Sequence, residues 1–249
     1  MDHVHESSSA RLDGLRVAIT GGTSGLGLAL TRALAARGAR VAFVARSRNR
    51  VESTARATPG VHGIVGDVAS KEAIHLIAMQ ILGSLGGLDV LVNNASSLGP
   101  TPLALLADTE SEDFELALHT NVLGPFRLTK ALLGALSASA REGRAPLVLN
   151  ISSDAANNAY AGWGAYGASK AALQQMSRVW NEELSAHDVR VLAVDPGDMD
   201  TPLHDVAVPD ADPSTLKQPE DAARELLDLI AAPVPASAAS GSAAEASLA

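Results

Sequence analysis

Short apolar runs alternate along the chain with longer stretches in which apolar residues recur at helical spacing. This alternation predicts an α/β domain with a parallel sheet and crossover helices. Most runs are continuous in Val, Ile, Leu and Ala, as in strands covered on both faces. The predicted strands are Arg16–Thr20, Arg40–Ala45, Val61–Val65, Val90–Asn93, Leu147–Ile151 and Val189–Val194. Helical spacing joins Leu26, Leu30, Ala33 and Leu34 after the first strand, and Ile74, Ile77, Ala78, Ile81, Leu82 and Leu85 after the third.

The second half of the chain predicts two further helices. Asp108–Ala140 is long enough for one extended helix, with a break near Gly124-Pro125. The last helix is expected at Pro219–Ala232, because proline suits a first helical turn. From Pro233 onward the chain is rich in Ala and Ser and has almost no large apolar residues, so we expect a flexible tail at 233–249. A second flexible tail at 1–13 precedes a single domain at 14–232.

Composition narrows the class of protein. The chain has 249 residues, 47% of them hydrophobic, which suits one α/β domain with a sizeable core. Its net charge is −9 without a Lys/Arg-rich run, which argues against nucleic acid or an anionic membrane as partner. No apolar stretch approaches the ~18 residues of a membrane span. The start, MDHVHESSSA, lacks the basic and apolar regions of a secretory signal. We therefore expect a cytoplasmic protein.

Cysteine and histidine usage limits the chemistry. The chain has no cysteine, which excludes disulfides and thiol catalysis. Its seven histidines form no His-Glu-x-x-His or similar set, so no metal site is expected.

The segment Thr20-Gly-Gly-Thr-Ser-Gly-Leu-Gly27 follows the first predicted strand directly and precedes a helix. Glycines let the backbone approach a pyrophosphate, and the helix N-terminus supplies N–H groups. The alternative is a glycine-rich turn without a ligand. A nucleoside triphosphate site is disfavoured, because no Gly-Lys-Ser/Thr ending is present.

The end of the second strand indicates which dinucleotide binds. A carboxylate about 20 residues beyond the glycines selects the free ribose hydroxyls of NAD. This chain has Ala45-Arg46-Ser47-Arg48 there, and a guanidinium can hold a 2′-phosphate with paired hydrogen bonds. The sequence thus predicts NADP(H) in preference to NAD(H). The alternative is that both arginines are simply solvated.

Candidate catalytic residues lie in Tyr166-Gly-Ala-Ser-Lys170 and at Ser153, thirteen residues upstream. Tyr166 and Lys170 share one face if the segment is helical. The ammonium then favours the phenolate, and the tyrosine can exchange a proton with a carbonyl oxygen that Ser153 holds. Alone, Tyr-x-x-x-Lys is a common helix-surface pattern, so its meaning depends on the surrounding motifs.

Taken in order, these motifs resemble the short-chain dehydrogenase/reductase family over about residues 14–232. Each is weak alone, but all occur in order at predicted strand ends and helix starts. The resemblance implies a doubly wound Rossmann-type domain with six strands, or seven if the final part of the chain adds one. The motifs are Thr20-Gly-x-x-x-Gly-x-Gly27, Asp67-Val68, Asn93-Asn-Ala95, Asn121, Ser153, Tyr166-x-x-x-Lys170 and Pro196-Gly197 with Thr201.

The resemblance also implies residue roles. Tyr166 would be the acid in reduction and the base in oxidation, and Ser153 would bond the substrate oxygen. Lys170 would bind the nicotinamide ribose, and Asn121 would anchor a water that relays protons to it. Alternatively, Asn121 only bonds the helix backbone and Ser153 only caps a turn.

Asp67 and Val68 would hold the adenine, Asn94 would line the adenosine ribose, and Pro196–Thr201 would cover the nicotinamide. The candidate cofactor-binding residues are Gly21, Thr23, Ser24, Gly25, Leu26, Gly27, Arg46, Asp67, Val68, Asn94, Tyr166, Lys170, Pro196, Gly197, Met199 and Thr201.

Three features depart from the family pattern. Ser96 follows Asn93-Asn-Ala95 where the family usually has Gly, and we expect only a local adjustment. No final strand with an Asp-Gly-Gly ending is recognisable after Ala232; that strand commonly shapes subunit contacts. A homodimer or homotetramer is nevertheless expected.

The third departure is an acidic loop without Lys or Arg between Val191 and Leu216. It is either a solvated charged loop or a lid that repels anionic substrates and acyl carrier proteins and favours neutral or cationic ones. Its acidic residues are Asp195, Asp198, Asp200, Asp205, Asp210 and Asp212. Leu98, Ala155 and Trp163 flank the catalytic motifs and are candidate pocket walls, although Trp163 can equally be a packing residue.

The sequence therefore favours an NADP(H)-dependent oxidoreductase that interconverts a small carbonyl compound and an alcohol. Two alternatives stay open: a non-catalytic NADP(H)-binding sensor or scaffold, and a sugar-nucleotide epimerase or dehydratase. The second of these usually needs a larger C-terminal substrate domain, for which this chain has no room.

Overall fold

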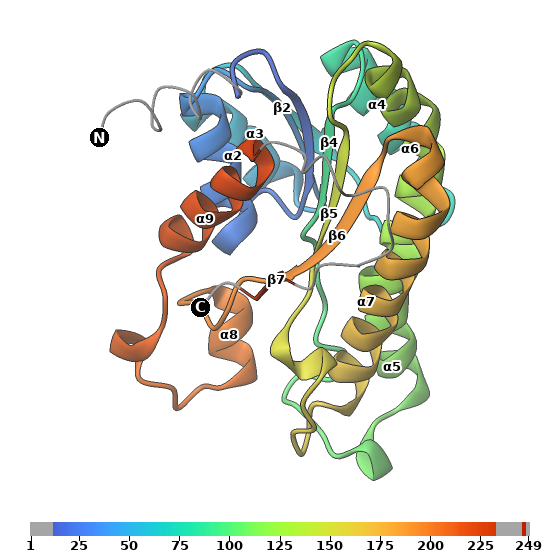
Figure 1. Cartoon of the computed structure of the whole chain (residues 1–249). Coiled ribbons are helices and arrows are strands. Elements are labelled where there is room, and N and C mark those ends of the chain that lie inside the picture. The colour runs from blue at the N-terminus through green and yellow to red at the C-terminus, as the bar shows by residue number, and fades with distance from the viewer. Residues whose placement is uncertain (1–11, 233–245, 248–249) are drawn as a thin grey trace, which may run out of the picture.

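A parallel sheet runs through the middle of the molecule in the computed structural model, which describes residues 12–232 and 246–247 (Figure 1). Within these residues the sheet has seven strands in the order β3-β2-β1-β4-β5-β6-β7, and every neighbouring pair is parallel. The strands are β1 Arg16–Thr20, β2 Arg40–Ala45, β3 Val61–Val65, β4 Val90–Asn93, β5 Leu147–Ile151, β6 Arg190–Asp195 and β7 Ala246–Ser247.

Helices cover both faces of this sheet. In Figure 1, α2, α3 and α9 lie on one side, and α4, α6 and α7 lie on the other. The helices are α2 Gly25–Ala36, α3 Arg48–Ala57, α4 Ile74–Leu85, α5 Ser111–Leu118, α6 Gly124–Arg141, α7 Gly164–Leu184, α8 Pro202–Ala207 and α9 Pro219–Ala231. The predicted doubly wound α/β architecture is thus confirmed.

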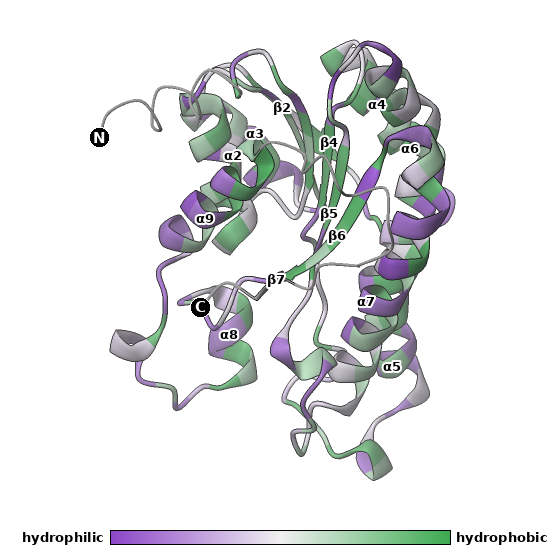
Figure 2. Ribbon diagram, viewed as in Figure 1, coloured by the Kyte–Doolittle hydropathy of each residue, from purple (hydrophilic) through white to green (hydrophobic). Residues whose placement is uncertain are grey.

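Alternating side chains of the central strands build two separate hydrophobic cores. Val17 and Ile19 of β1 pack with α2 and α9, whereas Ala18 between them packs with α4 and α6. Because both faces are buried, β1 can be apolar at every position, and the strands are among the most hydrophobic parts of the chain (Figure 2). This double burial explains why the sequence pattern locates the strands so closely.

Five of the six predicted strands have the expected bounds, and the sixth is displaced by one residue. The amide of Val189 donates to Leu184 at the end of α7, so pairing with β5 begins at Arg190 and β6 extends to Asp195. The strand that was not recognisable in the sequence is the two-residue β7, which pairs with Val194 and Asp195. Two residues are too few for an apolar run to show.

The predicted tails lie largely outside the described residues. Of the tail expected at 1–13, Leu12 is fully buried in the core beside α2 and α9. Of the tail expected at 233–249, the structure describes 246–247. The predicted last helix is α9, which ends at Ala231.

The helix predicted at Asp108–Ala140 is interrupted. Asp108 belongs to a separate 3-10 turn, Leu106–Asp108, and α5 begins only at Ser111. A π-helical turn, His119–Leu123, then separates α5 from α6 directly before Gly124. Such turns insert an extra residue into a helix and are frequent at functional sites. This one contains Asn121.

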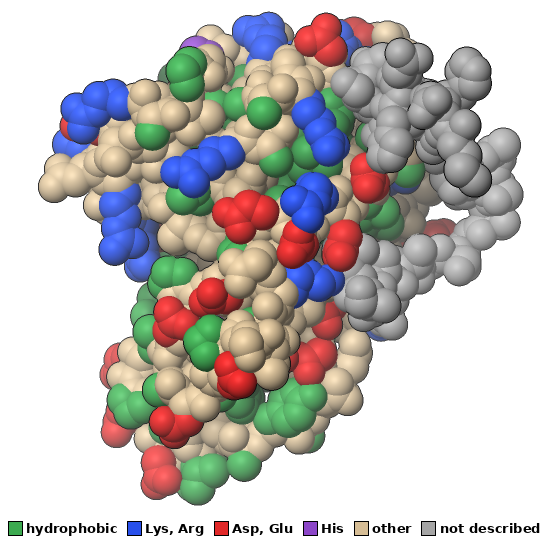
Figure 3. Space-filling model, turned by 90° about the vertical axis from the view of Figure 1, so that its left-hand side faces the viewer, with side chains coloured by type: hydrophobic (Ala, Val, Ile, Leu, Met, Phe, Trp, Pro, Cys, Tyr) green, Lys and Arg blue, Asp and Glu red, His purple; other side chains and the backbone are tan. Residues whose placement is uncertain are grey.

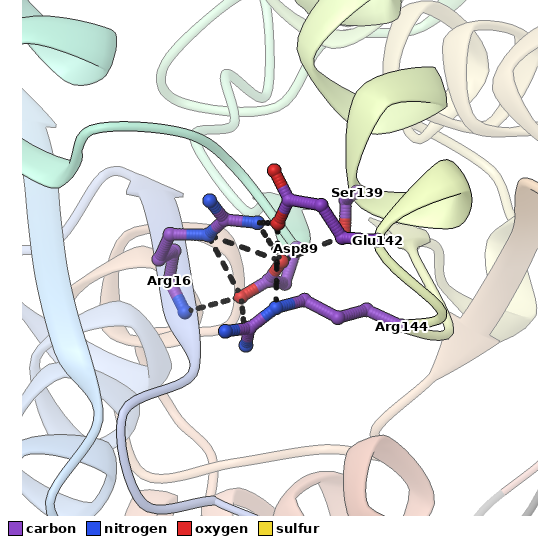
Figure 4. A network of polar contacts seen from close by, with 5 residues as sticks. All are labelled: Arg16, Asp89, Ser139, Glu142 and Arg144. Atoms are coloured by element: carbon purple, nitrogen blue, oxygen red, sulfur yellow. Dashed lines mark hydrogen bonds and ion pairs between the residues drawn. The ribbon is translucent and has the colours of Figure 1, made fainter.

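A network of charged side chains closes the amino ends of the strands (Figure 4). Asp89, which precedes β4, is only 1% exposed and accepts from the backbone N of Arg16 at 2.8 Å and from its Nη2 at 2.7 Å. Ser139 at the end of α6 donates to it at 2.7 Å, and Arg144 donates at 3.2 Å. Glu142 accepts from Arg16 at 2.8 Å. The network ties β1, β4 and α6 together.

Candidate active site

A pocket of about 430 Å³ lies at the opposite end of the sheet, where the strands have their carboxyl ends. Residues that follow β1, β2, β4, β5 and β6 all contribute to its wall. The sheet order reverses between β1 and β4, and ligands of open α/β sheets bind at such a switch point. The pocket is therefore the candidate functional site.

The glycine-rich loop forms the floor of the pocket beside α2. Gly21 and Gly25 have φ angles of +73° and +47°, a region that residues with a side chain rarely adopt. Gly27 does not line the pocket; a Cβ there would lie 2.3 Å from the carbonyl oxygen of Gly21, so glycine is needed for close packing. The predicted residues Gly21, Thr23, Ser24, Gly25 and Leu26 all line the pocket.

Asn94 joins this loop to the end of β4. Its Nδ2 donates to the carbonyl oxygen of Thr20 at 2.9 Å, and its backbone N donates to Thr20 Oγ1 at 3.0 Å. Asn94 thereby holds the ends of β1 and β4 together and also lines the pocket.

Basic residues line the pocket beyond β2. Arg46 lies there as predicted, together with Ser47 and Arg50. Arg48 does not line the pocket; its side chain is 72% exposed and approaches Glu52 at 3.9 Å. Of the two arginines weighed in the sequence, only Arg46 lines the pocket. Arg50 was missed, although its position in the first turn of α3, three residues after the N-cap Ser47, could have indicated it.

Asp67 and Val68, after β3, continue the wall of the pocket. Val68 is buried, and Asp67 Oδ1 accepts from the amide of Ala69 at 2.9 Å, which fixes the carboxylate in a tight turn. Both residues line the pocket, and their contact with an adenine stays a prediction.

Tyr166 and Lys170 share one face of α7 and line the pocket at the end of β5. The Lys170 Nζ lies 5.3 Å from the Tyr166 ring centroid and donates to the carbonyl oxygen of Ile151 at 2.8 Å. Lys170 is only 2% exposed, and burial lowers its pKa to about 8, against the opposing charge of Asp195.

The Tyr166 phenol is held in its protonated form. Burial raises its pKa to about 12, hydrogen bonds with Ser153 and Ser96 act in the opposite direction, and the charges of Asp195 and Asp154 raise it further. Burial is the largest of these effects, so the neutral phenol is the favoured form.

Ser153 makes two local hydrogen bonds at the end of β5. Its Oγ accepts from the amide of Ala155 at 3.2 Å and donates to Asp154 Oδ1 at 3.1 Å. The first contact caps the 3-10 turn Asp154–Ala156 (η3), so the capping alternative describes part of its role. The same hydroxyl faces Tyr166 and lines the pocket.

Asn121 supports the site from behind and does not line the pocket. It is 1% exposed; its Oδ1 accepts from the amide of Ser97 at 2.8 Å and from Ser96 Oγ at 3.2 Å. Its Nδ2 donates to the Ser97 carbonyl oxygen and to Ser169 Oγ, both at 2.8 Å. The side chain therefore fixes the loop after β4 rather than bonding its own helix backbone. Ser96, the departure from the family glycine, is thus tied to Asn121 and lines the pocket.

The remaining wall comes from apolar side chains and from the segment after β6. Leu98 and Trp163 line the pocket, whereas Ala155 packs against them from behind. The Trp163 ring meets the Tyr166 ring edge-on, with centroids 5.6 Å apart, so Trp163 both packs and forms the wall. The predicted cover residues Pro196, Gly197, Met199 and Thr201 line the pocket too, together with Asp154, Asp195, Asp198 and His204, which the sequence had not assigned to it.

The six aspartates of the acidic loop have different surroundings. Only Asp195 and Asp198 line the pocket. Asp212 accepts from the amide of Ser214 at 2.9 Å, and Asp205 and Asp210 are exposed. On the face shown in Figure 3, acidic and hydrophobic side chains cover the lower part, whereas basic and acidic side chains are mixed above. The solvated-loop interpretation therefore fits the exposed aspartates, Asp198 included, and does not describe Asp195, which is partly buried in the pocket wall.

Among residues 12–232 and 246–247, no group of three or more His, Asp or Glu side chains could hold a metal ion. No helix in the same part of the chain is long and apolar enough to cross a membrane.

The sheet, the switch-point pocket and the glycine loop together are the arrangement of dinucleotide-binding α/β proteins. A family model described as short chain dehydrogenase matches residues 16–212. The chain belongs to the short-chain dehydrogenase/reductase family, whose members are oxidoreductases that bind a nicotinamide cofactor.

Individual relatives agree with this family. The chain is 32% identical to L-xylulose reductase from Bos taurus over 197 residues, 79% of this chain and 77% of that one. It is 32% identical to 3-oxoacyl-[acyl-carrier-protein] reductase from Thermotoga maritima over 197 residues, 78% of this chain and 77% of that one. A short-chain dehydrogenase from Shigella flexneri 2a str. 301, solved in complex with NADP, is 28% identical, with a TM-score of 0.80 over 88% of this chain and 93% of that one.

Proposed function

We propose that this protein is an NADP(H)-dependent oxidoreductase that interconverts a small, uncharged ketone or aldehyde and the corresponding alcohol. The observation that carries the proposal is one continuous pocket with Arg46 and Arg50 in one wall and Ser153, Tyr166 and Lys170 in another. Arg46 follows β2 and Ser153 follows β5, three strand spacings apart, which is about 14 Å.

The residues present fit such a cofactor. The glycine loop lets a pyrophosphate approach the start of α2, where Ser24 makes no side-chain cap to the first N–H groups. Asn94 and Lys170 line the pocket between this loop and the catalytic residues, where the riboses would lie. When bound, the cofactor supplies or accepts the hydride.

The protein's own residues handle the substrate oxygen and its proton. Ser153 and Tyr166 hydrogen-bond the carbonyl oxygen, and the protonated phenol gives its proton as that oxygen gains charge. In the reverse direction the phenolate takes the proton of the alcohol. Proton transfer by one positioned group contributes about 10²–10⁴-fold. Lys170, held by the Ile151 carbonyl, keeps positive charge beside the phenol.

Arg46 and Arg50 favour the 2′-phosphate of NADP(H) over the free ribose of NAD(H), because a guanidinium bonds phosphate oxygens in pairs. We expect Arg46→Ala to raise the KM for NADPH about 10–100-fold while the KM for NADH stays within about threefold. Initial rates with each cofactor measure this. Arg48→Ala is the matched control, since Arg48 is an exposed neighbour outside the pocket. Equal losses in both variants would remove the assignment to Arg46.

Asp195 and Asp198 beside the catalytic residues support uncharged substrates over anionic ones. A screen of neutral ketones and ketoses, L-xylulose included, against β-ketoacyl thioesters of acyl carrier protein tests this choice with NADPH and NADH. We expect turnover of a neutral compound with NADPH. Efficient turnover of the carrier-bound thioester would overturn the charge argument, and cofactor binding without any turnover would favour a sensor.

The homo-oligomeric state and the cytoplasmic location stay predictions. A group of partly exposed apolar side chains on α5, α6 and α7, namely Leu116, Phe126 and Val179, offers a surface on which a second copy could pack.

A further inference from the structure

A third hydrophobic cluster, separate from the two cores of the sheet, surrounds the candidate catalytic tyrosine. Leu98, Ala155 and Tyr166 are its buried members, and Trp163 and Ala207 are among the side chains that pack against them. Of these residues, Leu98, Trp163 and Ala207 line the pocket together with Tyr166. These three side chains form an apolar wall beside the phenol, and they come from the loop after β4, the start of α7 and the end of α8.

Helix α8 lies across the pocket. Its N-cap Thr201 contacts the glycine loop, since a Cβ added at Gly25 would lie 3.1 Å from Thr201 Cγ2. Its last residue, Ala207, packs against the cluster around Tyr166. Leu203, four residues before Ala207 and on the same side of the helix, also lines the pocket. Because no residue of α8 is buried, Leu203 has apolar surface that a bound compound can cover.

Two of the acidic side chains at this end of the pocket already have hydrogen-bond partners within the protein. Asp154 Oδ2 accepts from the Tyr160 hydroxyl at 2.7 Å, and Asp195 Oδ1 accepts from the amide of Gly197 at 2.9 Å. A ketose has a hydroxyl on every carbon except the carbonyl carbon, and hydroxyls placed against the apolar wall would lose their hydrogen bonds with water without a replacement. The other polar side chains on this side, which can serve a single polar group, are Asp198 and His204.

We propose that the substrate is a carbonyl compound with an apolar substituent, an alkyl chain or an aromatic ring, which packs against the apolar wall and Leu203. The inference rests on the proposed function and narrows its substrate class: among neutral compounds, ketones and aldehydes with a hydrocarbon substituent are preferred to ketoses. The carbonyl oxygen meets Ser153 and Tyr166 as in the proposed mechanism. The hydrocarbon part covers apolar surface that is otherwise in contact with water, and this burial favours binding.

A homologous series of 2-ketones tests the proposal in the wild type. Each added CH2 group that leaves water stabilises the bound compound, so kcat/KM with NADPH should rise about three- to fourfold per CH2 group, or about tenfold from 2-butanone to 2-hexanone. 2-Pentanone and 4-hydroxy-2-butanone differ only in a terminal methyl or hydroxyl group, and we expect a preference of at least about tenfold for 2-pentanone. A flat series, or equally efficient turnover of these two compounds, would overturn the proposal.

Leu203→Ser tests the contribution of α8. It removes apolar contact with the far end of the substituent, so the ratio of kcat/KM for 2-hexanone to that for 2-butanone should fall about threefold. Val206→Ser is the matched control, because Val206 is an exposed residue of the same short helix that does not line the pocket, and it should keep the wild-type ratio. An unchanged ratio in Leu203→Ser, or an equal fall in both variants, would contradict the placement of the substituent against α8.

Binding gives a readout that does not depend on turnover. The chain has two tryptophans, and Trp180, whose ring centroid lies 6.0 Å from that of Phe126, does not line the pocket. In Trp180→Phe the tryptophan fluorescence therefore comes from Trp163 in the apolar wall. The NADP⁺-loaded variant is titrated with amides from propanamide to hexanamide, which have a carbonyl oxygen but are not converted by the oxidised cofactor. Their Kd values should fall about three- to fourfold per CH2 group.

The two readouts distinguish a failure of this inference from a failure of the proposed function. Absence of turnover with every carbonyl compound would count against the proposed function, while the amide series would still decide whether the pocket prefers an apolar substituent. Kd values that do not depend on the length of the amide would overturn the inference, even where turnover of a ketose supports the proposed function.

Discussion

Two groups of buried polar side chains lie at opposite ends of the same strands, and their surroundings differ. At the amino ends, Asp89 has several donors: burial raises its pKa, but hydrogen bonds from Arg16 and Ser139 outweigh burial and leave it lowered. The hydrogen bond with Asp89 likewise raises the pKa of Arg16. Both groups are stabilised in their charged forms.

At the carboxyl ends of the strands the pKa shifts have the opposite sense. Burial lowers the pKa of Lys170 and raises those of Tyr166 and Asp195, so each charged form is disfavoured. Perturbed groups of this kind cluster at functional sites. The difference teaches that burial alone does not mark a functional residue: the network at Asp89 favours the charged forms of its members, whereas the groups around Tyr166, the proposed proton donor, are buried at a cost in stability.

The largest effect on stability is expected at Asp89. Asp89→Asn would leave Arg16 buried beside a neutral group and should lower the free energy of unfolding by about 3–5 kcal/mol, with turnover per folded molecule unchanged. Because the pKa of Asp89 is lowered, its contribution in the wild type should be present above about pH 4 and be lost as pH falls further. Urea unfolding between pH 3 and 7 measures both the loss in Asp89→Asn and the pH dependence of the wild type.

Glu142→Gln is the matched control within the same network. Glu142 also pairs with Arg16, but its side chain is 50% exposed, so we expect a loss below about 1 kcal/mol. A loss at Asp89 as small as that at Glu142 would mean that the network is not the structural clamp described.

A smaller effect on the free energy of unfolding is expected at Lys170, where burial disfavours the charged form instead of stabilising it. Its pKa is lowered to about 8 in the folded chain, so between about pH 8 and 10 the unfolded chain binds more protons and the free energy of unfolding rises with pH. The rise should be on the order of 2 kcal/mol, and Lys170→Met should abolish it. Unfolding curves at pH 8, 9 and 10 measure the slope. The exposed Lys71→Met should keep the wild-type slope; the same slope in Lys170→Met would contradict the comparison.

The sequence predicts the strands well because each central strand is buried on both faces and leaves a continuous apolar run. It also identifies most pocket residues, because they lie directly after those runs. The π-helical turn around Asn121 leaves no such trace, since it depends on one extra residue within a helical pattern. Asn121 was a candidate from the motif pattern, but its bonds to the loop after β4 depend on tertiary structure.

Charged residues are harder to place from sequence. Arg46, Arg48 and Arg50 look alike in the chain, and only the direction of α3 decides that Arg48 faces solvent. Asp154 and Asp195 follow different strands and act on Tyr166 only because β5 and β6 are neighbours. The sequence alone therefore does not show that these two carboxylates act on Tyr166.

The most direct test of the account is a single-turnover measurement on Tyr166→Phe loaded with NADPH and mixed with a carbonyl substrate from the screen. NADPH consumption should fall about 10³-fold against the wild type, with cofactor affinity within about threefold and stability undiminished. That result would show that the site at Tyr166 serves turnover, in contrast to the network at Asp89, which serves the stability of the fold. Near-normal turnover in Tyr166→Phe would contradict the assignment of Tyr166 as the proton donor and, with it, the account of this site.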